Sequence, residues 1–71
     1  MKETGCARPI SLVMYQFGYD CFITCHHQSR WEYQISDDMV ELINERRGIR
    51  FYIKLEEFNR NWKIVSREGK W

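Results

Sequence analysis

Residues 36–55 read SDDMVELINERRGIRFYIKL, and this stretch decides which fold the sequence predicts. In its first half, apolar residues recur at helical spacing, which predicts one amphipathic helix. The apolar stripe of this helix consists of Met39, Leu42 and Ile43. We expect the helix to begin at Asp37 or Asp38, because an aspartate at that position accepts hydrogen bonds from free backbone N–H groups. Gly48 is expected to end the helix in a left-handed conformation.

The second half of the stretch changes to a period of two, which is typical of a strand with one buried and one wet face. The apolar face consists of Ile49, Phe51, Ile53 and Leu55, and the polar face of Arg50, Tyr52 and Lys54. The rest of the chain must bury the apolar faces of both elements. The predicted core therefore consists of Met39, Leu42, Ile43, Phe51 and Ile53.

Four further segments have the composition of strands. Residues 10–17 form an apolar run that we expect to be covered on both faces, and residues 21–27 follow it after the turn Gly18-Tyr19-Asp20. So short a connection predicts an antiparallel pair. Residues 31–35 alternate between apolar and polar side chains, and residues 62–66 form a short last strand.

These elements predict one α+β domain over residues 1–71, with loose termini at residues 1–8 and 67–71. Its antiparallel sheet has four to five strands with one helix packed on it, in the order β-β-β-α-β-β. The alternative is a small SH3-like barrel. In that fold residues 55–60 are a short helical turn before the last strand, since Leu55, Phe58 and Trp62 also recur at helical spacing.

The composition limits the classes of function. A chain of 71 residues builds a small core, yet 15% of its residues are aromatic. We expect some of these rings to lie at the surface as a contact site. The net charge of +1 produces no overall field that would attract nucleic acid or acidic membranes.

The cysteine and histidine residues first suggest a metal site. On an extended strand Cys21 and Cys25 lie about 13 Å apart, which zinc bonds of roughly 2.0–2.3 Å cannot bridge. The same distance excludes a disulfide between them. We therefore expect both to be small buried hydrophobic residues, with no bound metal. Three cysteines, an odd number, favour free thiols in the reducing cytoplasm, and no apolar run is long enough to span a membrane.

A catalytic function is not expected. Cys25 and His27 share a strand face and could pair as thiolate and imidazole. A cysteine nucleophile also needs a third group that orients the base, and the sequence offers no such group. The chain is expected to use no cofactor.

The sequence favours a small non-catalytic protein-binding module, such as a regulator or inhibitor of a larger protein. The candidate binding residues are Arg50, Tyr52, Lys54, Trp62, Lys63 and Trp71. The alternative is RNA or single-stranded DNA binding, in which a base stacks on Tyr52 and the nearby cations meet phosphates. An ordinary solvated strand face would carry the same lysine and arginine residues.

Self-association is the last expectation. A sheet built from hairpins has edge strands that pair unless they are blocked. Residues 62–66 are the expected edge, with Tyr52 beside it, and Lys63 and Arg67 oppose pairing there. A two-fold homodimer would cover both the edge and the excess aromatic surface, and we expect it in preference to a monomer.

Overall fold

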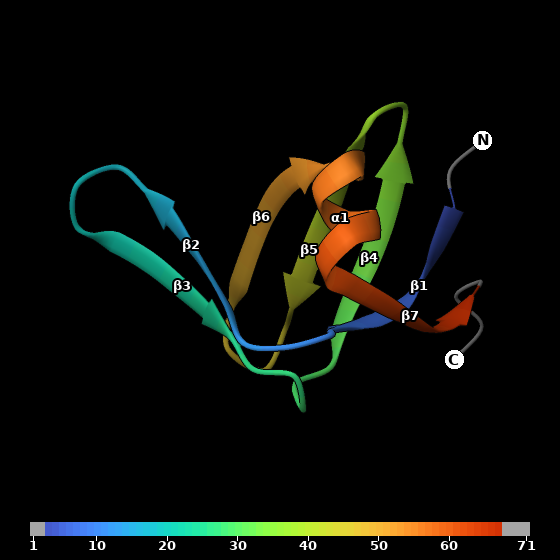
Figure 1. Ribbon diagram of the computed structural model, residues 1–71, viewed down its shortest axis with the longest axis horizontal. Helices are drawn as coiled ribbons and strands as arrows, with labels where there is room; N and C mark the ends of the chain where they lie inside the picture. Colours follow the sequence, from blue (N-terminus) through green and yellow to red (C-terminus); the bar gives the residue numbers. More distant parts are fainter. Residues whose placement is uncertain (1–2, 68–71) are drawn as a thin grey trace.

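The computed structural model describes residues 3–67, which form strands and one short helix (Figure 1). The elements are β1 (Glu3–Pro9), β2 (Val13–Phe17), β3 (Cys21–Cys25), β4 (Trp31–Ser36), β5 (Met39–Asn44), β6 (Ile49–Lys54), α1 (Leu55–Asn61) and β7 (Trp62–Arg67). Five strands form one antiparallel sheet in the order β6-β5-β4-β1-β7, and β2 pairs with β3 in a separate hairpin. The small antiparallel α+β class with one packed helix is therefore confirmed.

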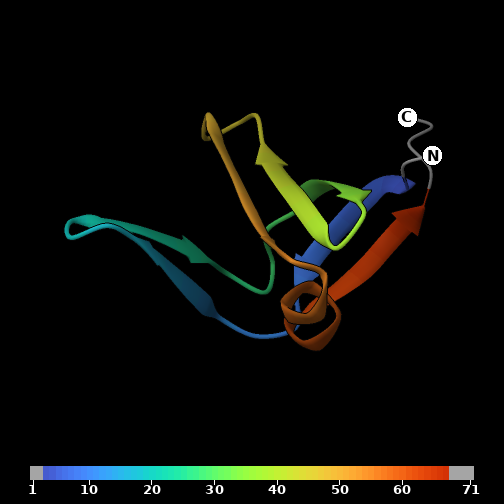
Figure 2. The same ribbon diagram turned by 90° about the horizontal axis from the view of Figure 1, so that it is seen from above.

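The hairpin β2–β3 extends away from the five-stranded sheet when the molecule is seen from either direction (Figures 1 and 2). We call this hairpin, residues 13–25, the hairpin arm. Its first strand leaves the sheet at the end of β1, and its second returns to the start of β4. Helix α1 packs on β5, β6 and β7.

The core lies between the sheet, α1 and the inner face of the hairpin arm. It consists of Ala7, Cys25, Trp31, Tyr33, Val40, Leu42, Phe51, Ile53, Phe58 and Trp62. Trp31 lies at its centre and meets Phe51 and Trp62 edge to face, with ring centroids 5.4 Å and 6.0 Å away. Aromatic rings prefer this geometry because the positive edge of one ring meets the negative face of the other.

The prediction of a helix between Asp37 and Gly48 is wrong, because this segment contains strand β5 and two turns. Ser36 pairs with Met39, so that Asp37 and Asp38 form a tight turn between β4 and β5. The order of elements is thus six strands, one helix and a last strand within residues 3–67, and not β-β-β-α-β-β.

The sequence of β5, MVELIN, fits two periods at once. The helical period selects Met39, Leu42 and Ile43, whereas the strand period buries Val40, Leu42 and Asn44. A segment this short cannot distinguish the two periods. The neighbours decide between them, because β4 and β6 supply hydrogen-bonding partners along both edges of β5.

Gly48 has the left-handed conformation that the sequence predicted, with φ of 68°. It serves the turn between β5 and β6, however, and not the end of a helix. The buried Asn44 holds this turn, because its side-chain oxygen accepts a hydrogen bond of 3.2 Å from the backbone N–H of Arg47.

The N-terminal segment is a second correction. We expected residues 1–8 to be loose, but Glu3–Pro9 form β1, which lies inside the sheet between β4 and β7. The residues of β1 are small, and Gly5, Cys6 and Ala7 are all buried. Small side chains gave no hydrophobic signal in the sequence, although they suit a crowded central strand.

The short helix lies where the SH3-like alternative predicted a helical turn. Helix α1 covers Leu55–Asn61, directly before the last strand, and buries Phe58. Phe58 stacks on Trp62 with ring centroids 6.2 Å apart and meets Tyr33 at 5.2 Å. The helix therefore fills the space between β6 and β7, which lie at opposite edges of the sheet.

The predicted core is confirmed for Leu42, Phe51 and Ile53, which are buried. Met39 and Ile43 are only half-buried, because in a strand they point to the outer face. Cys25 is buried as expected, but Cys21 is exposed because it lies near the tip of the hairpin arm.

Candidate functional site

The inner face of the hairpin arm packs on the sheet through aromatic rings. Tyr15 and Phe17 both contact Phe51 of β6, with ring centroids 5.3 Å and 5.6 Å away. Val13 and Ile23 pack against the core beside them. Alternation along β2 places these side chains on one face and leaves Met14 and Gln16 on the other.

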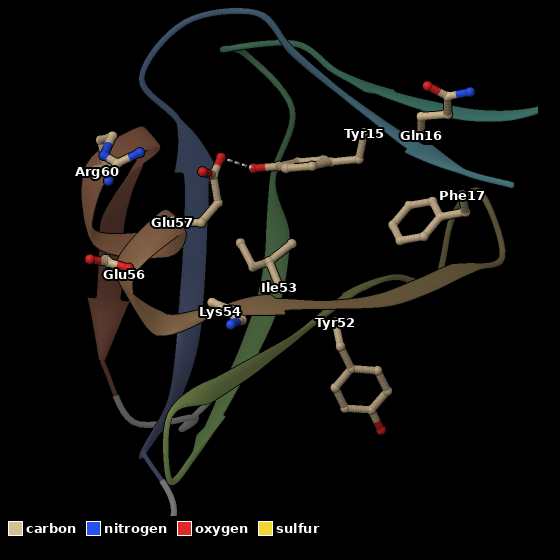
Figure 3. A pocket seen from close by; sticks show the side chains of 9 residues that line it. All are labelled: Tyr15, Gln16, Phe17, Tyr52, Ile53, Lys54, Glu56, Glu57 and Arg60. Atoms are coloured by element: carbon tan, nitrogen blue, oxygen red, sulfur yellow. Dashed lines mark hydrogen bonds between the residues drawn. The ribbon is translucent and has the colours of Figure 1, made fainter.

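A polar network joins the arm to α1 and β7. The Tyr15 hydroxyl donates a hydrogen bond of 2.9 Å to Glu57, as Figure 3 shows, and accepts one of 2.9 Å from the indole N–H of Trp62. Asn61 also donates to Glu57. Burial, and then the bond to the Glu57 carboxylate, raise the pKa of Tyr15 above its usual range, so Tyr15 remains a neutral donor.

A groove of about 380 Å³ lies where β2 passes β6 and α1 (Figure 3). Its lining residues are Tyr15, Gln16, Phe17, Tyr52, Ile53, Lys54, Glu56, Glu57 and Arg60. Ile53 points toward Tyr15, and Phe17 lies on the same side of β6. The groove thus combines an apolar floor with charged residues of both signs from β6 and α1.

The hairpin arm and the segment that leads into it expose many apolar side chains. Eight large apolar side chains are exposed within residues 3–67, and six of them lie between Ile10 and Phe22. These six are Ile10, Leu12, Met14, Phe17, Tyr19 and Phe22. Because Met14 pairs with Thr24 and Gln16 with Phe22, the Met14 and Phe22 side chains share the outer face of the arm. A concentration of exposed apolar residues such as this is typical of an interaction surface.

The structure brings together three of the predicted site residues. Arg50, Tyr52 and Lys54 all lie on the exposed face of β6, as their alternation predicted. Arg50 forms an ion pair of 3.1 Å with Glu41 on β5. Tyr52 borders the groove, but its ring points to the opposite side of β6 from Phe17 and Ile53 (Figure 3).

The other predicted site residues lie elsewhere. Lys63 is exposed on β7, which is the opposite edge of the sheet from β6, so the expectation that Tyr52 lies beside the last strand is wrong. Trp62 is buried in the core, where its indole N–H donates a hydrogen bond to the Tyr15 hydroxyl. Trp71 lies outside the described residues.

Strand β6 presents a free hydrogen-bonding edge. The backbone N–H of Leu55 donates to Asp38 at 2.8 Å, and hydrogen-bonded pairs alternate along antiparallel strands. The backbone groups of Ile53 therefore face β5, whereas those of Tyr52 and Lys54 face outward. No strand within residues 3–67 pairs with this outer edge.

The three cysteine residues of the described chain lie on two elements, Cys6 on β1 and Cys21 and Cys25 on β3. Cys6, Cys21 and Cys25 are free thiols. Burial raises the pKa of the Cys25 thiol to about 11, although the Arg47 charge opposes this shift. Within residues 3–67, no group of three histidine, cysteine or acidic residues is arranged to hold a metal ion.

The sequence did not lead us to expect the hairpin arm as a candidate interaction surface. The signal was present in residues 10–17, which carry apolar side chains on both faces. We expected both faces to be covered, but only the inner face meets the core. The groove was also missed, because it joins Tyr15 and Phe17 to residues about forty positions away in the chain.

The only helix among residues 3–67 is too short and too polar to cross a bilayer. Comparisons of the chain with protein-family models, with curated proteins and with solved structures find no match.

Proposed function

We propose that this protein is a small non-catalytic binding module that holds a segment of a partner protein, as a regulator or inhibitor of a larger protein would. The observation that carries the proposal is the concentration of exposed apolar side chains between Ile10 and Phe22, on the hairpin arm and the segment that leads into it. Burying apolar surface is the main favourable term in protein association. A fold of this size keeps such a surface in water at a cost in solubility.

The groove and the free edge of β6 support an extended partner segment. A strand added to β6 would hydrogen-bond to the outward-facing backbone of Tyr52 and Lys54. Alternate side chains of that strand would then reach either the groove beside Phe17 and Ile53 or the exposed Tyr52 ring. Main-chain bonds would contribute affinity, and the groove would contribute specificity.

The chemistry of the thiols supports a non-catalytic role. A cysteine nucleophile works as the thiolate, whereas burial holds Cys25 as the neutral thiol with a pKa of about 11. Because all three cysteines are free, a reducing compartment such as the cytoplasm is where we expect the protein to act.

The test is capture of a partner by immobilised protein from an extract of the native host. A variant with Met14→Glu and Phe22→Glu charges the outer face of the arm, and both positions are exposed, so the fold should be retained. Val65→Glu is the matched control, since Val65 is an exposed apolar residue on β7. We expect the wild type and the control to retain one partner that the double variant loses.

The captured protein is then purified and its affinity for all three chains is measured by calorimetry. A loss of about tenfold or more in the double variant corresponds to about 1.4 kcal/mol or more of binding free energy. Circular dichroism checks that each variant is folded. Equal affinity of the double variant and the wild type would remove the hairpin arm as the binding surface.

A second candidate function is binding of RNA or single-stranded DNA. The observation in its favour is that Tyr52 is exposed between Arg50 and Lys54 on one strand face, which matches the logic of base stacking flanked by cations. The ion pair of Arg50 with Glu41 weakens this candidate. Nucleic-acid binding would weaken steeply with added salt, whereas binding at an apolar interface would not.

A further inference from the structure

Three exposed cationic side chains line one surface hollow: one on β1, one on β7 and one just before β4. Arg8 of β1 lies directly opposite Lys63 of β7. The register of β1 with β4 ends at the pair of Ala7 with Trp31, and Arg30, the residue before Trp31, lines the same surface hollow as Arg8 and Lys63. All three side chains are exposed. We call Arg30, Arg8 and Lys63 the cationic row.

The cationic row borders a surface hollow of about 410 Å³, together with Gln28, Ser29 and Ile64. None of the described residues that line this hollow is acidic. The ion pairs within residues 3–67 join Arg50 to Glu41 and Arg67 to Glu3. In this part of the chain, those two sheet arginines therefore have acidic partners, and the cationic row has none.

Like charges directly opposite each other destabilise a pair of strands. Arg8 has Lys63 directly opposite, and Arg30 lines the same hollow, so the three like charges carry an electrostatic cost that a bound anion would remove. We propose that this hollow is a binding site for a phosphate group of a phosphate-bearing ligand.

The donors favour phosphate over carboxylate. An arginine guanidinium presents a planar fork that pairs with two oxygen atoms, and the row holds two arginines and one lysine. A phosphate monoester has three terminal oxygens that can be shared among these three donors, whereas a carboxylate has only two. A neighbouring hollow shares Arg30 and adds Arg46 and Arg47, but Glu32 and Glu45 also line it, so the hollow beside the cationic row, which no acidic residue of the described chain lines, is the better phosphate site.

The binding would depend on charge and not on base recognition. Trp31 is the aromatic residue among those that line the two hollows, and it is fully buried. Among the residues lining them, no exposed ring is therefore available for a base to stack on, which single-strand recognition requires. The phosphate could come from a nucleic-acid backbone or from a small polyphosphate, and the experiment separates these sources.

The probe is inorganic tripolyphosphate, and the readout is the melting temperature of the full chain. Sodium chloride at equal ionic strength serves as the reference. A ligand that binds only the folded state raises the melting temperature. A rise of about 4–8 °C is expected when the probe is present at about four to five times its Kd.

The variants Arg8→Gln and Lys63→Gln should each reduce this rise by at least half. Their melting temperatures without the probe should equal or exceed that of the wild type, because the repulsion is relieved. Arg30→Gln provides the same test from a third element of the fold. Arg60→Gln, an exposed cation on α1 that lines neither hollow, is the matched control and should keep the full rise.

No rise in the wild type, or an equal rise in the row variants, would overturn the proposal. Equal stabilisation by an oligoglutamate of the same charge would overturn phosphate as the ligand class. A thymidine oligonucleotide is tested in parallel. If it binds in a manner that depends on Arg8 and Lys63, the source is a nucleic-acid backbone. If tripolyphosphate alone does so, the source is a small polyphosphate.

Discussion

Gly5 lies where β1 approaches β7 and the Tyr33 ring so closely that no side chain fits. A Cβ atom at Gly5 would overlap the carbonyl oxygen of Ser66 and would lie 2.8 Å from the Tyr33 ring. Backbone atoms cannot move aside without opening the sheet. We predict that Gly5→Ala lowers the free energy of unfolding by about 3 kcal/mol or more, measured by urea denaturation.

Gly48→Ala is the control for this prediction. Gly48 has a left-handed backbone with φ of 68°, but a Cβ atom at this position would have open space for 4 Å around it. Gly48→Ala should therefore lower the free energy of unfolding only by the conformational cost of a left-handed alanine, about 1–2 kcal/mol. A Gly5→Ala variant as stable as Gly48→Ala would show that β1 and β7 do not approach as described.

The alkaline stability of the fold depends on Cys25 and Tyr33, and at still higher pH on Tyr15, whose pKa burial also raises. Burial raises the pKa of Cys25 from 9.0 to about 11, and burial with a hydrogen bond to Glu3 raises that of Tyr33 from 10.0 to about 12. In the unfolded chain both groups lose their protons at a lower pH than in the folded protein. The stabilisation is therefore complete below pH 9 and is lost as the pH rises through the folded values of about 11 and 12.

Urea denaturation under reducing conditions should show this loss at roughly 1.4 kcal/mol for each unit of pKa difference. A Cys25→Ala variant lacks the contribution of Cys25 to this pH dependence. Its free energy of unfolding should therefore fall less steeply between pH 9 and about 11. An unchanged pH dependence in this variant would mean that Cys25 ionises normally in the folded protein.

The strand conformation of β5 predicts different effects of substitution from those of the helix expected at the same place. Leu42 is fully buried and Ile43 is only half-buried, although both would face the core in a helix. Leu42→Ala should lower the free energy of unfolding by about 2–5 kcal/mol. Ile43→Ala should cost less than half as much, because its removal opens no cavity in the core.

Urea denaturation of the two variants decides between the two conformations. Similar losses for Leu42→Ala and Ile43→Ala would favour the helical stripe. Val40→Ala gives a further check, since Val40 is fully buried only in the strand arrangement.

At the scale of the whole molecule, the exposed arm and the edges β6 and β7, which no strand within residues 3–67 covers, make self-association an expected outcome. Edge strands and apolar surface both promote pairing of copies. We predict that the mass in sedimentation equilibrium rises from 8.8 kDa toward twice that value with concentration. A variant with Met14→Glu and Phe22→Glu should remain at the mass of one chain.

A mass of 8.8 kDa for the wild type at every concentration would remove the homodimer. The hairpin arm would then be free for a different protein. A dimer that persists in the arm variant would instead indicate pairing through β6 or β7, and Lys63 and Arg67 oppose the second of these.

Much of the fold could be predicted from local sequence. Alternation located β6 with its buried Phe51 and Ile53, and helical spacing of Leu55, Phe58 and Trp62 located α1 as the alternative. Gly48 was predicted to be left-handed because glycine adopts that backbone without strain. The exposed face of Arg50, Tyr52 and Lys54 followed from the same alternation. These features depend on a few neighbouring residues, so the sequence by itself determined them.

Contacts between distant segments decided the rest. β5 is a strand because β4 and β6 flank it, although its six residues also suit a helix. β1 is an inner strand, between β4 and β7, because Gly5 and Ala7 leave space for larger residues around them, which no hydrophobic pattern reveals. The groove and the cationic row likewise join residues far apart in the chain. Only the tertiary structure could create these features, because burial and strand pairing depend on which segments meet.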